Sequence, residues 1–415
     1  MNLTIMGERA RAAEKVLGTA GTSLKNQALT AMAAALLDRT EEILSANAQD
    51  MANAAENGMK ESMCDRLRLT PERIAGMADG IRQVAALSDP VGEIIEGSVR
   101  PNGMRIRQVR VPLGVVGIIY EARPNVTSDA AALCLKSGNV CILRGGKEAI
   151  ITNCTIADVL RDAVDSAGLP ADCIQLVTDT SRRVADQMMR LNQFIDVLIP
   201  RGGAGLIKAV VEKATVPVIE TGVGNCHVYV DQTADIEMAA SIIDNAKTSR
   251  PSVCNAIETI LVHKDIAAAA LPVIKERLDR KNVEIRGCER TAAILGDSIV
   301  PVTPQDYATE FLDYILACRV VDSFDEAIDH IARYSTGHSE CIVTRDYAHA
   351  EAFTARVDSA AVYVNCSTRF TDGGEFGLGA EIGISTQKLH ARGPMGIRQL
   401  TSSKFIILGD GQIRN

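Results

Sequence analysis

The stretch Val115-Val116-Gly117-Ile118-Ile119-Tyr120 is apolar throughout and shows no alternation with polar residues. Such a run is typical of a strand that is buried on both faces of a parallel sheet. Further apolar runs follow, separated by helical patterns over 127–137 and 151–167; these runs are 139–143, 174–177 and 195–199. This alternation predicts a doubly wound α/β fold.

A second series of the same kind begins after Asp231. Its pattern predicts a helix over 236–249, a strand over 259–262, a helix over 265–279 and further strands near Val320 and Val362. Because 415 residues exceed the size at which one hydrophobic core keeps growing, two domains are expected, with a short crossing between them near 227–231.

The N-terminal residues, from Met6 to about Val99, carry apolar residues at helical spacing and predict helices, one of them beginning at Thr70-Pro71. The period then changes to two on either side of Pro101-Asn102-Gly103, which predicts a β-hairpin arm. The apolar segment Lys404–Leu408 predicts another strand. These strands either pair across subunits or pair only within one subunit.

Composition describes an ordinary α/β protein, with 47% hydrophobic and 23% charged residues and no Trp. The net charge of −8 gives no general attraction to nucleic acid or to anionic membranes. Eleven cysteines without C-x-x-C pairs indicate a reducing compartment and argue against a disulfide framework or a structural zinc site. With no signal-peptide pattern and no apolar stretch of roughly 18 to 20 residues, a cytoplasmic protein is expected. The cysteine pattern leads us to expect no bound metal.

Cys254, in Arg250-Pro-Ser-Val-Cys-Asn, is the candidate nucleophile. A proline followed by Cys and a small polar residue predicts a tight turn, whose exposed N–H groups lower a thiol pKa and form an oxyanion hole. The alternative, a small buried hydrophobe, is our interpretation of the other ten cysteines. Arg250 is a candidate for lowering the thiol pKa.

Two glycine-rich turns follow predicted strands, Arg144-Gly145-Gly146-Lys147 and Arg201-Gly202-Gly203. Small residues and cations where a helix begins are typical of a site for nucleotide phosphates. Arg144 and Lys147 favour NADP(H) over NAD(H), because they accommodate a 2′-phosphate, whereas Glu148 opposes that preference.

Two polar residues are placed after predicted strands. Glu220, with Gly222, follows a predicted strand over 216–219, and its carboxylate is a general base or a turn cap. Asn125 follows the first apolar strand; its amide donates to a developing oxyanion, or the residue simply begins a helix.

Six strings occur in order along the chain: Y-E-A-R-P-N-V-T-S-D from Tyr120, L-R-G-G-K-E-A from Leu143, P-R-G-G-A-G-L-I from Pro200, E-T-G-V-G-N-C-H-V-Y-V-D from Glu220, R-P-S-V-C-N-A from Arg250 and G-L-G-A-E-I-G-I-S-T from Gly377. Together they resemble the gamma-glutamyl phosphate reductase family of the aldehyde dehydrogenase superfamily, over nearly the whole chain. The N-terminal helices match least.

The resemblance implies NADPH-dependent reduction of L-glutamyl 5-phosphate to L-glutamate 5-semialdehyde and phosphate, in proline biosynthesis. Cys254 then forms a thioester, and the Asn125 amide and the Cys254 N–H hold the oxyanion. Glu310 takes the position of a glutamate that binds the nicotinamide ribose. Arg250 is then also a candidate for binding phosphate. Lys388, His390 and Arg392 form a second cationic group for phosphate or the α-carboxylate, unless they are only an exposed charge run.

The resemblance also implies an NADP-binding domain at 1–98 and 113–228, a catalytic domain at 229–395 with an acyl pocket at 370–379, and an arm at 99–112 and 396–415 for homo-oligomerisation. A kinase that supplies the labile acyl phosphate is a further candidate partner. Pro200-Arg-Gly-Gly and Glu220-Thr-Gly-Val replace the G-x-T-x-x-G and E-L-G-G of hydrolytic aldehyde dehydrogenases, so hydrolysis is not implied. Glu220 is then either structural or a cofactor ligand, together with Gly222. The alternatives are another acyl-enzyme reductase of the superfamily and a non-catalytic nucleotide-binding protein.

Overall fold

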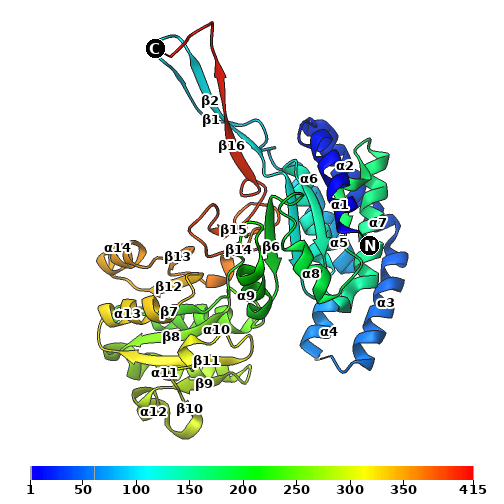
Figure 1. Ribbon diagram of the computed structural model, residues 1–415. Coiled ribbons are helices and arrows are strands. Elements are labelled where there is room, and N and C mark those ends of the chain that lie inside the picture. The colour runs from blue at the N-terminus through cyan, green and yellow to red at the C-terminus, as the bar shows by residue number, and fades with distance from the viewer. Residues whose placement is uncertain (1, 60, 415) are drawn as a thin grey trace. The chain divides into compact units, whose positions relative to one another are not determined.

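A computed structural model of the chain describes residues 2–59 and 61–414 (Figure 1). They form two compact units. Unit 1 comprises Met1–Thr221, Gly377–Gly383 and Pro394–Asn415, and unit 2 comprises Gly222–Phe376 and Ile384–Gly393. The chain therefore first enters unit 2 at Gly222, ahead of the segment 227–231 where the sequence pattern placed the crossing.

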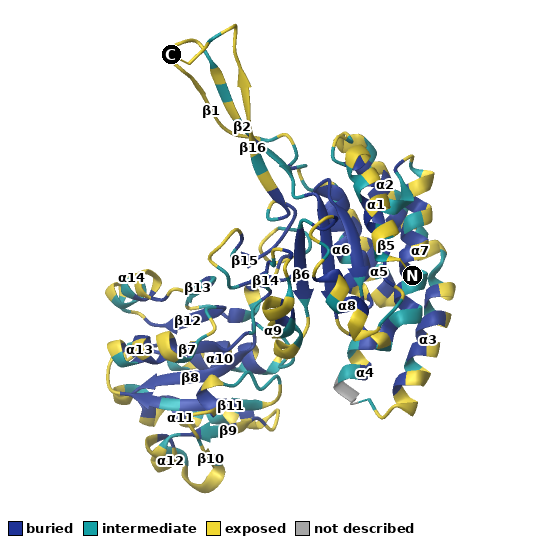
Figure 2. Ribbon diagram, viewed as in Figure 1, coloured by how far each residue is buried: buried dark blue, intermediate teal, exposed yellow. Residues whose placement is uncertain are grey.

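Unit 1 is built around a parallel sheet of four strands in the order β5-β4-β3-β6. The strands are β3 (Val115–Tyr120), β4 (Val140–Arg144), β5 (Ile174–Leu176) and β6 (Val197–Arg201). All six residues of the inner strand β3 are buried, as its unbroken apolar run predicts, and Figure 2 shows this sheet in the core of its unit. The doubly wound α/β expectation is confirmed for this unit.

Nine α-helices of unit 1 lie in the described ranges: α1 (Leu3–Leu17), α2 (Thr22–Asp38), α3 (Thr40–Glu56), α4 (Glu61–Leu67), α5 (Pro71–Ala86), α6 (Asn125–Lys136), α7 (Ile150–Ser166), α8 (Arg182–Met188) and α9 (Ala204–Lys213). The predicted start of α5 is confirmed, because the Thr70 hydroxyl accepts the Arg73 N–H at 3.2 Å and Pro71 opens the helix. Short 3₁₀ turns lie at Lys147–Ala149 and Ala171–Cys173.

The strand predicted over 216–219 is wrong as a full strand. Only an isolated bridge joins Leu198 to Val218, and the Leu198 N–H donates to the Pro217 carbonyl at 2.8 Å. Because Pro217 has no N–H of its own, it cannot supply the donor that a continuing ladder needs.

An antiparallel arm of three strands, in the order β1-β2-β16, extends from the body of unit 1 (Figure 1). Its strands are β1 (Ile94–Val99), β2 (Arg105–Pro112) and β16 (Thr401–Leu408). The predicted hairpin is confirmed, with Val99 opposite Arg105. The C-terminal strand pairs with β2 of its own chain, Leu408 lying opposite Arg105, and the outer part of the arm is exposed (Figure 2).

Unit 2 contains a parallel sheet of seven strands in the order β10-β9-β11-β8-β7-β12-β13. The strands are β7 (Cys226–Val230), β8 (Ile257–His263), β9 (Glu284–Gly287), β10 (Val300–Pro301), β11 (Ile315–Val321), β12 (Ser339–Val343) and β13 (Ala361–Val364). Every residue of β7 and β8 is buried. Because β7 pairs with β8 and β12, it is tied to this second sheet.

The helices of unit 2 are α10 (Ile236–Thr248), α11 (Lys264–Asp279), α12 (Glu289–Leu295), α13 (Phe324–Tyr334) and α14 (Tyr347–Arg356), with 3₁₀ turns at Gly296–Ser298, Asp306–Ala308 and Thr368–Phe370. One face of α13 packs into the core of unit 2, because its apolar residues recur at helical spacing and are all buried; they are Phe324, Ala327, Ile328 and Ile331. Two short strands, β14 (Ile384–Ser385) and β15 (Gly393–Pro394), lie near the last passages between the units. Among the described residues, no helix has the length and apolarity needed to cross a bilayer.

Candidate active site

Cys254 lies half-buried in the turn that joins α10 to β8. The next residue, Asn255, is buried, and its amide donates to the backbone carbonyls of Arg369 at 3.2 Å and Thr371 at 2.9 Å. The Thr368 hydroxyl donates to the Asn255 carbonyl at 2.6 Å. The turn is therefore fastened from one side by the segment 368–371, and Cys254 is held on a fixed backbone.

A second segment, 224–226, fastens the same turn. A Cβ on Gly224 would lie 1.5 Å from the Cys254 carbonyl oxygen, so only glycine fits there. The Cys226 thiol donates to that same oxygen at 3.2 Å, and burial raises its pKa well above the ordinary value, which keeps it a donor. Glu310 completes the arrangement, because its Oε1 accepts the Gly224 N–H at 2.8 Å.

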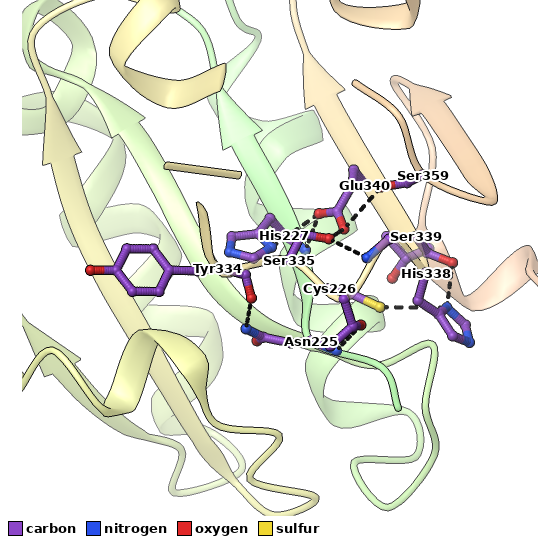
Figure 3. A network of polar contacts seen from close by, with 12 residues as sticks. Asn225, Cys226, His227, Tyr334, Ser335, His338, Ser339, Glu340 and Ser359 are labelled. Atoms are coloured by element: carbon purple, nitrogen blue, oxygen red, sulfur yellow. Dashed lines mark hydrogen bonds and ion pairs between the residues drawn. The ribbon is translucent and has the colours of Figure 1, made fainter. Parts of the chain in front are cut away.

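A buried polar chain connects these two supports, and Figure 3 shows three of its members, Cys226, His338 and Ser339. Cys226 Sγ lies 3.7 Å from His338 Nδ1, which shares a hydrogen bond of 2.8 Å with the Ser339 hydroxyl. Ser339 in turn shares one of 2.7 Å with Thr371, whose carbonyl accepts from Asn255. A closed circuit of hydrogen bonds therefore runs behind the Cys254 turn.

Figure 3 also shows a second contact beside this circuit, between His227 of β7 and Glu340 of β12. Glu340 Oε2 accepts the backbone N–H of His227 at 2.8 Å and lies 3.0 Å from its Nδ1, with both side chains fully buried. Ser335 and Ser359 donate to the other carboxylate oxygen. These contacts join neighbouring strands, so we interpret this pair as structural support for the sheet.

Arg369 is a functional candidate that sequence reasoning missed. Its Nε donates to the Ser249 hydroxyl at 3.1 Å and its Nη1 donates to Asn255 Oδ1. Burial lowers the pKa of this guanidinium and so does nearby Arg250, whereas Asp372 and Cys254 raise it. A cation bonded to Asn255, the residue next to Cys254, favours the thiolate of that cysteine. The only signal in the sequence is an arginine in the loop that follows the strand predicted near Val362.

In unit 1, the candidate cofactor residues gather at one sheet edge. Ile119 of β3 is level with Arg144 of β4, and Tyr120 is level with Arg201 of β6. Because the three strands are parallel, both glycine-rich turns and the turn leading to Asn125 leave the sheet at this edge. The sequence motifs are therefore neighbours in the fold.

The first of these turns carries two cations, although it also holds a carboxylate, because a Cβ on Gly146 would lie 2.3 Å from Glu148 Oε2. Arg144 is half-buried, its Nε is buried without a hydrogen-bond partner, and its Nη2 donates to the Thr180 carbonyl. Burial lowers the pKa of Arg144, while Glu148 and Asp179 raise it. Lys147 is exposed and makes no hydrogen bond or ion pair within the described ranges. Two cationic donors are thus available at the strand end.

The second turn is occupied by the protein's own carboxylate. The Gly203 N–H, at the start of α9, donates to Glu121 Oε2 at 2.9 Å, and a Cβ on Gly202 would lie 2.7 Å from that oxygen. The Arg201 guanidinium lies 3.8 Å from Glu381. We therefore expect a dinucleotide phosphate to be bound by the side chains of Arg144 and Lys147, since the Gly203 N–H of this turn is already engaged by Glu121.

Asn125 begins α6, and its amide Nδ2 donates to the Asp129 carboxylate at 2.9 Å. Burial raises the pKa of Asp129 to about 6, although Asn125 and Arg201 lower it. One amide proton of Asn125 is thus engaged within its own helix, and the other remains to serve a ligand.

Three cationic residues named from the sequence lie near the end of unit 2. Lys388 and Arg392 both form ion pairs with Asp358, and His390 has a left-handed backbone with φ 71°. Arg250 is exposed and is not ion-paired with any carboxylate in the described part of the chain. Of these residues, Arg250 therefore has the charge most available to an anion.

Glu220 is half-buried in unit 1 and Gly222 lies at the start of unit 2. The Gly222 N–H donates to the Ile384 carbonyl at 2.7 Å, and a Cβ there would collide with Thr386 at 2.3 Å. Gly222 thus meets a structural need for close approach of two segments.

The family model of the aldehyde dehydrogenase family matches residues 4–294. The chain is 60% identical over 412 residues to a gamma-glutamyl phosphate reductase from Heliobacterium modesticaldum, covering 99% of both chains. It is 60% identical to another from Clostridium novyi, covering 98% of this chain and 97% of the other. The crystal structure of a gamma-glutamyl phosphate reductase from Thermotoga maritima is 50% identical, covers 100% of both chains and matches with a TM-score of 0.97.

Proposed function

The chain belongs to the aldehyde dehydrogenase family and, within it, to the gamma-glutamyl phosphate reductases, and from that membership we propose that it reduces L-glutamyl 5-phosphate with NADPH through a thioester on Cys254. The products are L-glutamate 5-semialdehyde and phosphate, and the reaction belongs to proline biosynthesis. The chain is thus an oxidoreductase that acts on an acyl phosphate.

The covalent steps centre on the Cys254 sulfur. The thiolate attacks the carbonyl carbon, a C–S bond forms, and the C–O bond to the phosphoryl group breaks, so that phosphate leaves and a thioester remains. When bound, NADPH supplies the hydride that reduces this thioester. Collapse of the thiohemiacetal then releases the aldehyde and regenerates the thiolate. The observation that carries this assignment is the rigid turn around Cys254, fixed by Asn255 on one side and by Gly224 and Cys226 on the other.

The remaining roles are assigned by chemistry. Arg144 and Lys147, with Gly145 and Gly146, are proposed to bind the cofactor phosphates; Glu310 is proposed for the nicotinamide ribose. Asn125 and the Cys254 N–H are proposed as donors to oxyanions, each such donor being worth about 2.7 to 4 kcal/mol in a transition state. Arg201, Gly202, Gly203, Glu220, Gly222, Lys388, His390 and Arg392 remain candidates from sequence. The buried chain behind Cys226 is proposed to orient the nucleophile.

The arrangement of the whole enzyme follows the same reasoning. We assign cofactor binding to unit 1, the cysteine chemistry to unit 2 and oligomerisation to the arm formed by β1, β2 and β16. The arm carries exposed apolar residues such as Val99, Phe405 and Ile407, which supports a homo-oligomer. A cytoplasmic location and a kinase partner that delivers the labile acyl phosphate fit the same chemistry.

The test runs the reaction backwards, because the acyl phosphate is unstable. NADPH formation is followed from glutamate 5-semialdehyde and NADP⁺, with and without inorganic phosphate. Sustained turnover is expected only with phosphate, and Cys254→Ala should abolish it while NADP⁺ binding persists. Phosphate-independent turnover would instead indicate hydrolysis, and substantial activity of the alanine variant would remove the thioester from the mechanism.

A further inference from the structure

Arg369 is attached to the Cys254 turn at both of its ends. Its Nε donates to Ser249, which directly follows α10, and its Nη1 donates to the side chain of Asn255, next to the nucleophile. Its own backbone carbonyl accepts the Asn255 amide at 3.2 Å. The guanidinium is therefore oriented by neutral groups on either side of the sequence that carries Cys254.

No carboxylate is ion-paired with this cation within the described ranges, and the same is true of Arg250. Asp372 exerts an electrostatic effect on Arg369, but its Oδ1 accepts the N–H groups of Gly374 at 2.8 Å and Glu375 at 3.4 Å. By contrast, Lys388 and Arg392 share Asp358. Arg250 and Arg369 therefore both lie near Cys254 and neither is ion-paired with a carboxylate in the described residues. Together they form a candidate anion-binding site.

We propose that Arg369, together with Arg250, binds the phosphoryl group of the acyl phosphate beside Cys254. This inference rests on the proposed function, since it names the part of the substrate that one side of the site recognises. The phosphoryl oxygen is bonded directly to the carbon that Cys254 attacks, whereas the α-carboxylate lies at the opposite end of the glutamyl chain. An anion close to the sulfur is therefore the phosphoryl group.

The guanidinium stabilises the negative charge that passes to phosphate as its C–O bond breaks. In the reverse direction, it holds inorganic phosphate while a phosphate oxygen attacks the thioester carbon and the C–S bond breaks. Arg369 is thus a specificity-determining residue for acyl phosphates. The reverse reaction separates its role from that of Cys254, because thioester formation requires only Cys254, whereas the attack of phosphate on the thioester also requires Arg369.

The experiment compares Arg369→Met with the unchanged enzyme in the reverse direction. Mixing enzyme, semialdehyde and NADP⁺ without phosphate should give a burst of NADPH, as one thioester forms per site, and the variant should keep that burst. Turnover after phosphate is added should fall, with the KM for phosphate raised about 10- to 100-fold. The KM for semialdehyde should change by less than about 3-fold.

Arg369→Lys tests geometry, because it keeps a charge but loses the fork that donates to Ser249 and Asn255; partial recovery of the KM for phosphate is expected. Arg280→Met is the matched control, since Arg280 is exposed and pairs only with Glu276 among the described residues. NADP⁺ binding and thermal unfolding report whether each variant is folded. Iodoacetamide labelling of Cys254 should be slowed by inorganic phosphate in the unchanged enzyme and in Arg280→Met, but not in Arg369→Met.

The outcomes are distinct. A folded Arg369→Met with an unchanged KM for phosphate overturns the inference, as does a rise confined to the KM for semialdehyde, which would assign Arg369 to the α-carboxylate. If the unchanged enzyme gives no burst, the thioester proposal fails on its own. A burst with phosphate-specific loss in the variant supports both proposals.

Discussion

The backbone of Gly224 packs directly on Cys254. A Cβ at residue 224 would lie 1.5 Å from the Cys254 carbonyl oxygen and 2.7 Å from its Cα. No flexible side chain can yield here, because the colliding atoms belong to the backbone. The position of Cys254 therefore depends on the residues at and just before the start of β7, namely Gly224, which packs against its backbone, and Cys226, whose thiol donates to its carbonyl oxygen.

Gly224→Ala should therefore displace the Cys254 turn. Because a misplacement of about 1 Å is enough to lower a rate by roughly 100-fold, we expect kcat to fall by at least about that factor. Steady-state kinetics measure this effect. Gly21→Ala is the matched control, since a Cβ there meets no atom within 4 Å. Unchanged kcat in Gly224→Ala would mean that the turn adapts without moving the sulfur.

Asp129 should impose an acid limb on activity. Its carboxylate accepts the Asn125 amide at 2.9 Å, and burial raises its pKa to about 6. The charged acceptor that orients Asn125 is present above that pH and is lost as the pH falls through it. We expect kcat to decline below about pH 6 and the decline to disappear in Asp129→Asn, which should have a lower plateau. A pH profile that is identical in both proteins would remove Asp129 from the positioning of Asn125.

Lys247 and Glu258 form a fully buried ion pair of 2.6 Å, and Glu258 also accepts the Leu312 N–H at 3.1 Å, in the loop that carries Glu310. Lys247→Met leaves that carboxylate without its cation, so the free energy of unfolding should fall by about 3 to 5 kcal/mol at pH 8. Adding Glu258→Gln should restore part of the loss. Chemical denaturation measures both, and an equally unstable double variant would contradict the explanation.

Glu258 should also make stability depend on pH. Burial raises its pKa to about 7 from 4.5, while Lys247 lowers it. Since the folded state then binds more protons than the unfolded state between these values, the contribution of Glu258 to stability is present below 4.5 and is lost as the pH rises toward 7. Denaturation curves of Glu258→Gln should lack this decline. A decline of the same size in the variant would assign it to other groups.

Cys288 should be a second reactive thiol. Although burial raises its pKa, hydrogen bonds from Thr291 and from the Val320 N–H more than compensate, and the net pKa is lowered. In Cys254→Ala, iodoacetamide at neutral pH should label Cys288 faster than the half-buried Cys154 and Cys366, whose pKa values burial raises. Peptide mass spectrometry measures the order.

Cys288→Ser should remove that labelling and keep turnover within about 2-fold, since no contact joins Cys288 to the Cys254 turn in the described residues. This variant is also the proper background for labelling studies of Cys254. Faster labelling of Cys154 or Cys366 than of Cys288 would show that exposure outweighs thiolate content here.

Local patterns predicted much of the fold. The apolar runs at Val115–Tyr120 and Val140–Leu143 form buried parallel strands, and Pro101-Asn102-Gly103 turns the hairpin arm. The segment 216–219 forms only one bridge, because a strand must donate backbone N–H groups to its neighbour and Pro217 has no N–H. A pattern of apolar residues does not reveal this missing hydrogen-bond donor.

The sequence by itself determined the family of this protein and predicted where its chemistry lies: a cysteine in a Pro-Ser-Val-Cys-Asn turn and the cationic glycine-rich turn at Arg144–Lys147. Only the tertiary structure decided what surrounds them. Arg369 reaches Asn255 across 114 positions of sequence, while Lys388 and Arg392 meet Asp358. The reason is physical: periodicity reports which side chains share a local face, whereas charge pairing depends on segments that approach only when the sheet is assembled.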